Sequence, residues 1–187
     1  INSKSAEANT KQKHLNQQLF KAIRQYNKKE ILNAIKNGAD VNAVSKDGHS
    51  ALIMASYQGD LSLVKLLIDN NADVNEVSKR GDTALMVAAT EGNWSIAQLL
   101  IDHKADVNVA RKDGTTALIK ASRSGDLPIV KLLIDNKADV NAAGKDGATA
   151  LIKASRSGNL PIVKLLIDHK ADVNAARKDG TTALIKA

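Results

Sequence analysis

Apolar and polar positions follow one another in a pattern that returns every 33 residues. Each period holds two short, mostly apolar runs, such as residues 117–121 and 129–134, and polar or turn-forming residues follow each run. The tetrapeptide Ala-Asp-Val-Asn marks the same point of every period, beginning at residues 39, 72, 105, 138 and 171. A fixed period of this length predicts a stack of copies of one small unit, not a globule around a single core.

Within one copy the two runs predict two helices followed by a turn-rich finger. Thr116 precedes the first run and is a suitable N-cap, and Gly125 ends that helix. Asp126 caps the second helix, and Pro128 is tolerated in its first turn because the N–H groups there have no partner within the helix. Residues 139–147 are rich in turn formers and small residues, which predicts a β-hairpin-like finger.

Three segments carry a family resemblance. They are Thr-Ala-Leu at the start of the first helix, Leu-Pro-Ile-Val-Lys-Leu-Leu-Ile in the second helix, and Ala-Asp-Val-Asn before the finger. Together with the period, they resemble the ankyrin repeat family over residues 14–187. The resemblance implies an all-α repeat solenoid, in which helix-turn-helix units stack and β-hairpin fingers project from one edge. It also implies binding to other proteins through the fingers and the concave face of the first helices.

The period places the whole chain in one domain preceded by a tail. We expect residues 1–13, which are polar, to form a disordered N-terminal tail. Residues 14–187 form the repeat domain, with a capping repeat, full repeats and a partial last copy at 14–46, 47–79, 80–112, 113–145, 146–178 and 179–187.

The C-terminal end lacks the polar outer face that a terminal repeat needs. Leu184 and Ile185 would lie on an uncovered apolar surface, so either the natural chain continues past Ala187 or another molecule covers this end. We expect a monomer, with an end-to-end dimer through this surface as the alternative.

One position departs from the family pattern in a way that predicts backbone strain. The glycine that the family has after the second helix is present only as Gly38, and bulkier residues stand there in the later copies: Asn71, Lys104, Lys137 and Lys170. If this position is left-handed, a lysine there costs about 1 kcal/mol relative to glycine.

Composition excludes much chemistry. The chain has no cysteine, so disulfides, thiolate metal sites and a cysteine nucleophile are impossible. His103 and His169 lie two repeats apart, about 20 Å at the usual spacing of packed helices. No EF-hand loop, phosphate-binding glycine loop or catalytic triad can be assembled. We therefore expect no enzyme activity, no cofactor and no metal. No apolar run approaches the roughly 20 residues of a membrane span, and no targeting segment is recognised.

The net charge of +7 lies almost wholly in the C-terminal repeats. Residues 110–187 hold 14 Lys and Arg against 8 Asp and Glu, whereas residues 1–109 hold 13 against 12. Such a surface is either merely solvated or attracts an acidic partner.

Equivalent positions of stacked repeats form columns of side chains, which predicts a binding groove. Its N-terminal half offers a small apolar and aromatic surface made by Met54, Tyr57, Val87 and Thr90. Its C-terminal half offers a basic ladder made by Lys120, Arg123, Lys153, Arg156 and Lys186. The fingers add further cations: Arg111, Lys112, Lys145, Arg177 and Lys178.

Trp94 is the single tryptophan of a chain in which only 2% of residues are aromatic. It takes the place that leucine has in the other full repeats, at Leu61, Leu127 and Leu160. We therefore expect Trp94 in the core and Tyr57 on the contact surface.

Two function classes follow from this surface. The first is a protein-interaction module whose partner carries an acidic patch and one or two apolar anchors. The alternative is a binder of polyanions such as nucleic acid, acidic lipid or glycan. Against nucleic acid, the basic ladder has no interleaved aromatic side chains on which bases could stack. The lysines also have a third interpretation, because duplication of a repeat copies a surface lysine without selection for binding.

Overall fold

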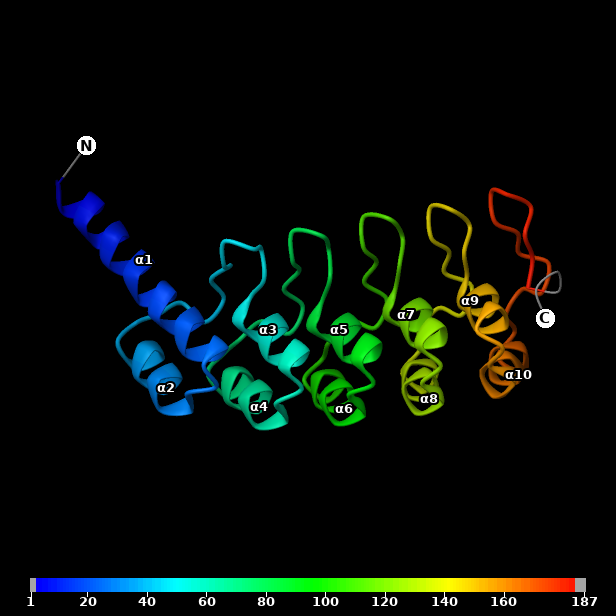
Figure 1. Cartoon of the computed structure of the whole chain (residues 1–187), viewed down its shortest axis with the longest axis horizontal. Coiled ribbons are helices and arrows are strands. Elements are labelled where there is room, and N and C mark those ends of the chain that lie inside the picture. Colours follow the sequence, from blue (N-terminus) through cyan, green and yellow to red (C-terminus); the bar gives the residue numbers. More distant parts are fainter. Residues whose placement is uncertain (1–2, 184–187) are drawn as a thin grey trace.

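The computed structural model describes residues 3–183, which form a row of stacked helix pairs (Figure 1). The first helices of the pairs lie in one row, the second helices lie in a row below them, and the fingers project from the opposite edge (Figure 1). Ten helices and no extended strand occur within this range, which confirms an all-α repeat stack. Their bounds are α1 Ser3–Arg24, α2 Lys28–Lys36, α3 Ala51–Gln58, α4 Leu61–Asp69, α5 Ala84–Glu91, α6 Trp94–Asp102, α7 Ala117–Ser124, α8 Leu127–Asp135, α9 Ala150–Arg156 and α10 Leu160–Asp168.

Side-chain caps set where the helices begin. The Thr116 hydroxyl accepts a hydrogen bond from the Ile119 N–H at 3.3 Å, and a Ser or Thr holds the same place before α3, α5 and α9. Helix α7 ends at Gly125, whose φ of 81° is left-handed. The Asp126 carboxylate then caps α8 by accepting from the Ile129 N–H at 2.9 Å. The predicted helix boundaries are confirmed in this repeat.

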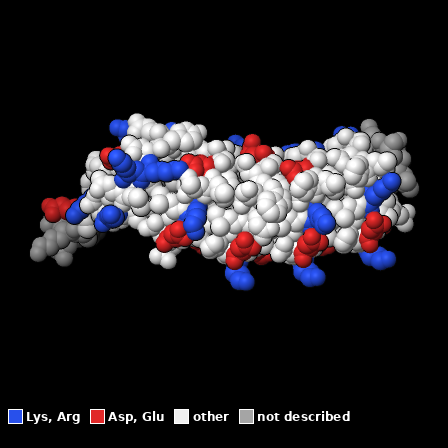
Figure 2. All heavy atoms as spheres, turned by 90° about the horizontal axis from the view of Figure 1, so that it is seen from below, with Lys and Arg blue, Asp and Glu red and all other residues white. Residues whose placement is uncertain are grey.

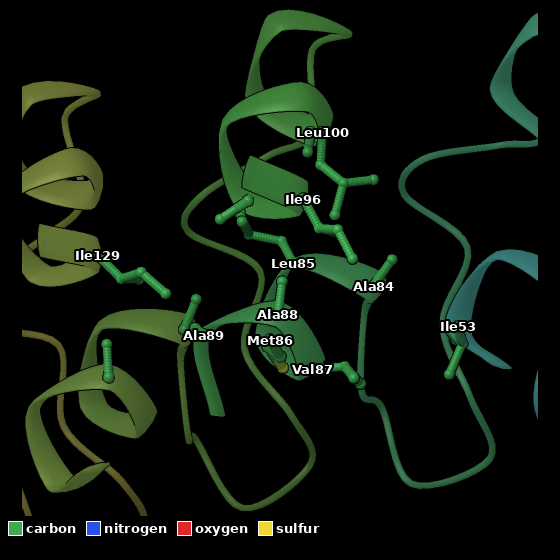
Figure 3. Close-up of a cluster of buried hydrophobic side chains, with 14 of the residues drawn as sticks. Ile53, Ala84, Leu85, Met86, Val87, Ala88, Ala89, Ile96, Leu100 and Ile129 are labelled. Atoms are coloured by element: carbon green, nitrogen blue, oxygen red, sulfur yellow. The ribbon is translucent and has the colours of Figure 1, made fainter. Parts of the chain in front are cut away.

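The first helices are buried on both sides by their neighbours. In α5 six successive residues, Ala84–Ala89, are buried. Figure 3 shows Leu85 directed toward Ile96 and Leu100 of α6. Because half of this run is alanine, α3 and α7 can both approach α5 closely, and each repeat packs mainly on the next. The core is therefore a continuous band along the stack.

An asparagine side chain links each repeat to the next. In Asn108, Oδ1 accepts a hydrogen bond from the Asp139 N–H at 2.8 Å, and Nδ2 donates to the Lys137 carbonyl at 3.1 Å. Asp139 in turn accepts from the Asn141 N–H at 2.9 Å, which holds the turn that presents the next asparagine. The same two bonds to the following repeat recur in what we term the asparagine ladder, Asn42, Asn75, Asn108 and Asn141.

Helix α1 stands where later repeats have a finger and a first helix. Its Asn16 Oδ1 accepts from the Asp40 N–H at 2.9 Å, and its Gln12 Nε2 donates to the Gly38 carbonyl at 2.9 Å. These are the two bonds that a single ladder asparagine makes elsewhere. The prediction of a disordered tail at residues 1–13 is therefore wrong for residues 3–13, which are helical. The polar residues that suggested disorder form the exposed side of this helix and pair with the turn after α2.

The residue after each second helix is left-handed, as the strain argument assumed. The φ values are 66° at Asn71, 69° at Lys104 and Lys137, and 66° at Lys170. Each of these carbonyls accepts a hydrogen bond from an asparagine of the ladder, which fixes the conformation in spite of its cost. The predictions made for Leu184, Ile185 and Lys186 lie outside the described residues.

Lys104→Gly should raise the free energy of unfolding by about 1 kcal/mol, because glycine removes the Cβ strain of the left-handed backbone. We expect a melting temperature about 2–4 °C higher by circular dichroism. Lys112→Gly, on a finger where φ is not left-handed, is the control and should not stabilise the protein. A lower or unchanged melting temperature for Lys104→Gly would contradict the argument.

Asn108→Ala should lower the free energy of unfolding by about 2 kcal/mol, because it removes two hydrogen bonds between repeats and leaves their backbone partners unpaired. The control is Asn174→Ala, since the Asn174 side chain makes no hydrogen bond to residues 3–183. Urea denaturation followed by circular dichroism measures both. Equal losses in the two variants would show that the asparagine ladder contributes nothing specific.

Candidate binding groove

The fingers and the first helices together line a groove along the stack. One hollow of this groove, of about 350 Å³, lies between the finger that ends near Asp113 and the next finger, which carries Gly144 and Asp146. Finger residues and first-helix residues line it together: Asp113, Thr115, Ile119, Arg123, Gly144, Lys145, Asp146, Ala148 and Lys153. Side chains that are far apart in sequence, such as Arg123, Lys145 and Lys153, thus lie around one space.

The N-terminal half of the groove differs from the predicted apolar surface. Val87 is buried at 1% exposure, so its proposed role in partner contact is wrong: the side chain fills the core between α3 and α5. Met54 and Thr90 are half-buried, and the Thr90 hydroxyl donates to the Met86 carbonyl at 2.8 Å. Tyr57 remains available at 48% exposure.

Tyr57 is held in place by His49, which the sequence analysis did not single out. The two rings meet edge to face with centroids 5.8 Å apart and planes 79° apart. Partial burial, followed by the negative charges of Asp82 and Glu91, raises the pKa of the Tyr57 hydroxyl. The hydroxyl therefore stays protonated at neutral pH and can donate a hydrogen bond.

Two of the predicted groove cations are already neutralised within the protein. Asp82 is buried at 4% exposure, and its Oδ1 lies 3.2 Å from the Lys120 ammonium and 3.6 Å from Arg111 Nε. No aligned hydrogen bond reaches this oxygen, so the interaction is an ion pair rather than a directed bond. The placement of Lys120 on an open basic ladder is therefore wrong, because Lys120 is itself buried and joins two repeats.

Arg177 also forms ion pairs within the protein. Its guanidinium lies 3.1 Å from Asp146 Oδ2 and 3.0 Å from Asp179 Oδ2, and it is half-buried. A hydrogen bond from the Ala148 N–H and the Arg177 charge together hold the pKa of Asp146 below its usual range, against a smaller effect of burial. The pair is therefore ionised on both sides at neutral pH.

Among the first helices α3, α5, α7 and α9, cations occur only on α7 and α9. Within residues 3–183 no carboxylate oxygen comes within 4 Å of six of the predicted groove cations, of which only Lys153 is half-buried: Lys112, Arg123, Lys145, Lys153, Arg156 and Lys178. The exposed finger residues Lys46, Lys79 and Arg80 of the N-terminal half likewise have no carboxylate oxygen within 4 Å among the described residues. Lys186, the last member of the predicted basic ladder, lies outside the described residues. The first-helix side of the groove thus changes from α3 and α5, which carry no cation, to α7 and α9, which carry the unpaired Arg123, Lys153 and Arg156, whereas unpaired finger cations occur in both halves.

Trp94 lies at the surface with 45% exposure, so its assignment to the core is wrong. The comparison with leucines failed because the leucines at this position are exposed too, at 37% or more: Leu61, Leu127 and Leu160. All four residues begin second helices, which form the underside of the stack (Figure 1). Figure 2 shows a row of charges along one long edge of this underside and further charges toward the opposite edge, with a largely uncharged band between them.

Comparison with known protein families agrees with this architecture. The sequence model of ankyrin repeats (3 copies) matches residues 19–111, 54–144 and 118–187. The chain belongs to the ankyrin repeat family. Ankyrin repeats generally mediate protein–protein interaction and are typically non-catalytic. A search of curated proteins found no match.

The described part of this ankyrin stack gathers no set of metal-ligating side chains. Residues 3–183 contain no group of three His, Cys, Asp or Glu side chains placed to hold a metal ion. The His103 and His169 rings each bond only to a carbonyl in their own helix, at 2.9 Å. No helix among the described residues is long and apolar enough to cross a membrane.

Asp82→Ala should lower the free energy of unfolding by about 3 kcal/mol, because it leaves the buried Lys120 ammonium without a counter-charge. Adding Lys120→Met should recover most of this loss, since no buried charge then remains. Urea denaturation of wild type, both single variants and the double variant gives the coupling energy. A double variant as unstable as Asp82→Ala alone would show that the pair is not coupled.

Proposed function

We propose that this ankyrin repeat chain is a non-catalytic interaction module whose groove binds an acidic segment of a protein partner. The observation that carries the proposal is the set of cations without internal partners, above all Arg123, Lys145, Lys153 and Arg156. Unpaired like charges repel one another, and a bound acidic segment relieves that repulsion. The proposed site needs no residue from a second copy of the chain, and we propose a monomer as the binding unit.

The proposed contact is confined to the last full repeats. Arg111 and Lys120 already neutralise the buried Asp82, so an acidic partner gains little from them. At the other end, the exposed Tyr57 and its edge contact with His49 supply an aromatic surface suited to an apolar anchor of the partner. The partner thus contacts the aromatic site at Tyr57 and, two repeats further along the stack, the basic residues that begin with Arg123.

Binding of a polyanion is the competing function. Two features disfavour it. The finger lysines alternate with carboxylates that are ionised, because hydrogen bonds and neighbouring cations outweigh the opposing effect of burial and hold the pKa values of Asp113 and Asp146 low. The cationic half of the groove also lacks aromatic side chains on which bases could stack.

Affinity capture from the native cell, with quantitative mass spectrometry, tests the proposal. The groove variant carries Arg123→Glu and Arg156→Glu, both at exposed positions on first helices. The matched control carries Lys131→Glu and Lys164→Glu, which make the same charge change in the same repeats on exposed second-helix positions. We expect a specific protein to be retained by the control and reduced roughly tenfold or more in the groove variant, since two charge contacts are reversed.

A partner that both variants retain would contradict a basic groove contact and move the site to the Tyr57 end or elsewhere. Capture that is abolished by nuclease, or that falls steeply with salt for any nucleic acid, would favour the polyanion function instead. Circular dichroism of each variant checks that the stack is folded.

A further inference from the structure

One finger position carries an internally paired arginine in two repeats and a glycine in the repeat between them. Arg111 and Arg177 occupy equivalent positions of their repeats, and Gly144 stands at the same position between them. The 350 Å³ hollow of the groove lies at this glycine. On its other side Ala148 replaces the larger Thr115 of the preceding repeat. Two of the few differences between these nearly identical repeats therefore open the same space.

The backbone does not require a glycine at this position. Gly144 is absent from the left-handed glycines of the structure, so a side chain could be carried there without that strain. A Cβ would meet Asp146 Oδ1 at 2.9 Å, which is the end of a side chain and not backbone. Gly144 therefore places no side chain in the space between the two fingers.

The spaces between neighbouring fingers, which we term cells, show which kind of side chain fits the hollow at Gly144. Arg177 lies between Asp146 and Asp179, at 3.1 and 3.0 Å from their carboxylate oxygens. Arg111 lies between Asp82 and Asp113, at 3.6 and 4.0 Å. Arg177 thus bridges the fingertip carboxylates of two successive repeats, whereas Arg111 bridges one fingertip carboxylate and Asp82, which stands at the repeat position of Ala148. Between these two arginines, the space between the fingertip residues Asp113 and Asp146 has no guanidinium among the described residues.

The two carboxylates beside Gly144 retain capacity for a further guanidinium. In each of them Oδ1 accepts one backbone N–H at 3.0 Å, from Thr115 for Asp113 and from Ala148 for Asp146. Their Oδ2 atoms are shared with Arg111 and Arg177. Since an ionised carboxylate offers about four lone-pair sites, each can accept another donor. Both groups have a low pKa, so both are charged at neutral pH.

Nearby cations do not prevent an arginine from occupying this kind of cell. Arg123, Lys145 and Lys153 stand beside the hollow. The repeat equivalents of Arg123 and Lys145 beside Arg177 are Arg156 and Lys178, and the equivalent of Lys153 beside Arg111 is Lys120. Arg177 nevertheless lies half-buried with two close carboxylates. The planar guanidinium of arginine can donate hydrogen bonds to two carboxylates at once, whereas the ammonium of lysine acts as a single point charge.

We propose that the hollow at Gly144 is a pocket for an arginine side chain of a protein partner, held between Asp113 and Asp146. This goes beyond the acidic contact proposed above, because it gives the partner one basic anchor within an otherwise acidic segment. It also sets the register of the partner along the groove, since the cell occurs at one repeat junction. The pocket can be tested with a small probe that needs no partner, so its failure is distinct from failure of the proposed function.

The test is a titration of the 15N-labelled protein with N-acetyl-arginine amide, followed by amide chemical shifts at constant ionic strength. We expect saturable shifts at Gly144, Lys145 and Ala148, and binding several-fold weaker for N-acetyl-lysine amide. N-acetyl-glutamate amide should give no saturable shift there. Gly144→Arg supplies the missing side chain from within and should abolish the response, while its spectrum reports that the fold is intact.

Two further variants keep the test decisive. Asp113→Asn should weaken the arginine probe several-fold even if Gly144→Arg were unstable. Arg177→Gly opens an equivalent cell between Asp146 and Asp179 and should create a second set of shifts at Lys178 and Thr181. Saturation by the glutamate probe, equal binding of the lysine probe, or an unchanged response in Gly144→Arg would each overturn the proposal.

Discussion

The hydrogen bonds of the asparagine ladder are the constraint on which the other features depend. Each of these side chains both accepts from and donates to the backbone of the next repeat, so it fixes the distance and the rotation between two copies. Alanine-rich first helices then pack at one spacing, and side chains at equivalent positions line up in columns. A groove with a defined sequence of side chains exists because the repeats cannot slide or rotate independently. The left-handed residues after the second helices follow from the same constraint, since their carbonyls must point toward the asparagines.

Along this regular frame, single residues decide whether a cation is structural or available. Asp82 converts Lys120 and Arg111 into parts of a buried ion network, whereas Thr115, at the same repeat position as Asp82, leaves Lys153 unpaired within residues 3–183. A count of cations in the sequence therefore overestimates the accessible positive charge at Lys120, which is paired, but not at Lys153, which is unpaired among the described residues. Repeat duplication explains why the lysines are present, and the local acids decide what each lysine does.

The helices and the strained left-handed positions were predictable because both depend on nearby residues. Thr116, Gly125 and Lys104 act within a few residues of their own position, and the period showed which positions were equivalent. Predictions of burial and of contacts between residues far apart in the sequence were wrong. Val87 and Lys120 share a column that was predicted to line the groove surface, but both side chains are buried. Trp94 was compared with leucines that are themselves exposed. Gln12 bonds a carbonyl 26 positions away, so a polar stretch that looked disordered is part of the folded unit. The pairing of Asp82 with Lys120 was missed. Asp82 is the one carboxylate at a repeat position that holds His49, Thr115 and Ala148 elsewhere, and a comparison of this column with that of Lys120 would have indicated the pair.

The asparagine ladder also gives the stack a direction. Every ladder side chain reaches toward the repeat that follows it, so the two faces of a repeat are chemically unequal. One face presents backbone groups that need a partner, and the other presents an amide side chain that water can satisfy at small cost. Removing a repeat from the N-terminal side would expose orphaned backbone groups, and α1 meets this need with Gln12 and Asn16. Removing one from the opposite side would free an asparagine and uncover the apolar face of the repeat before it. Lengthening or shortening of such an array by whole units therefore places different hydrogen-bonding demands on its two ends.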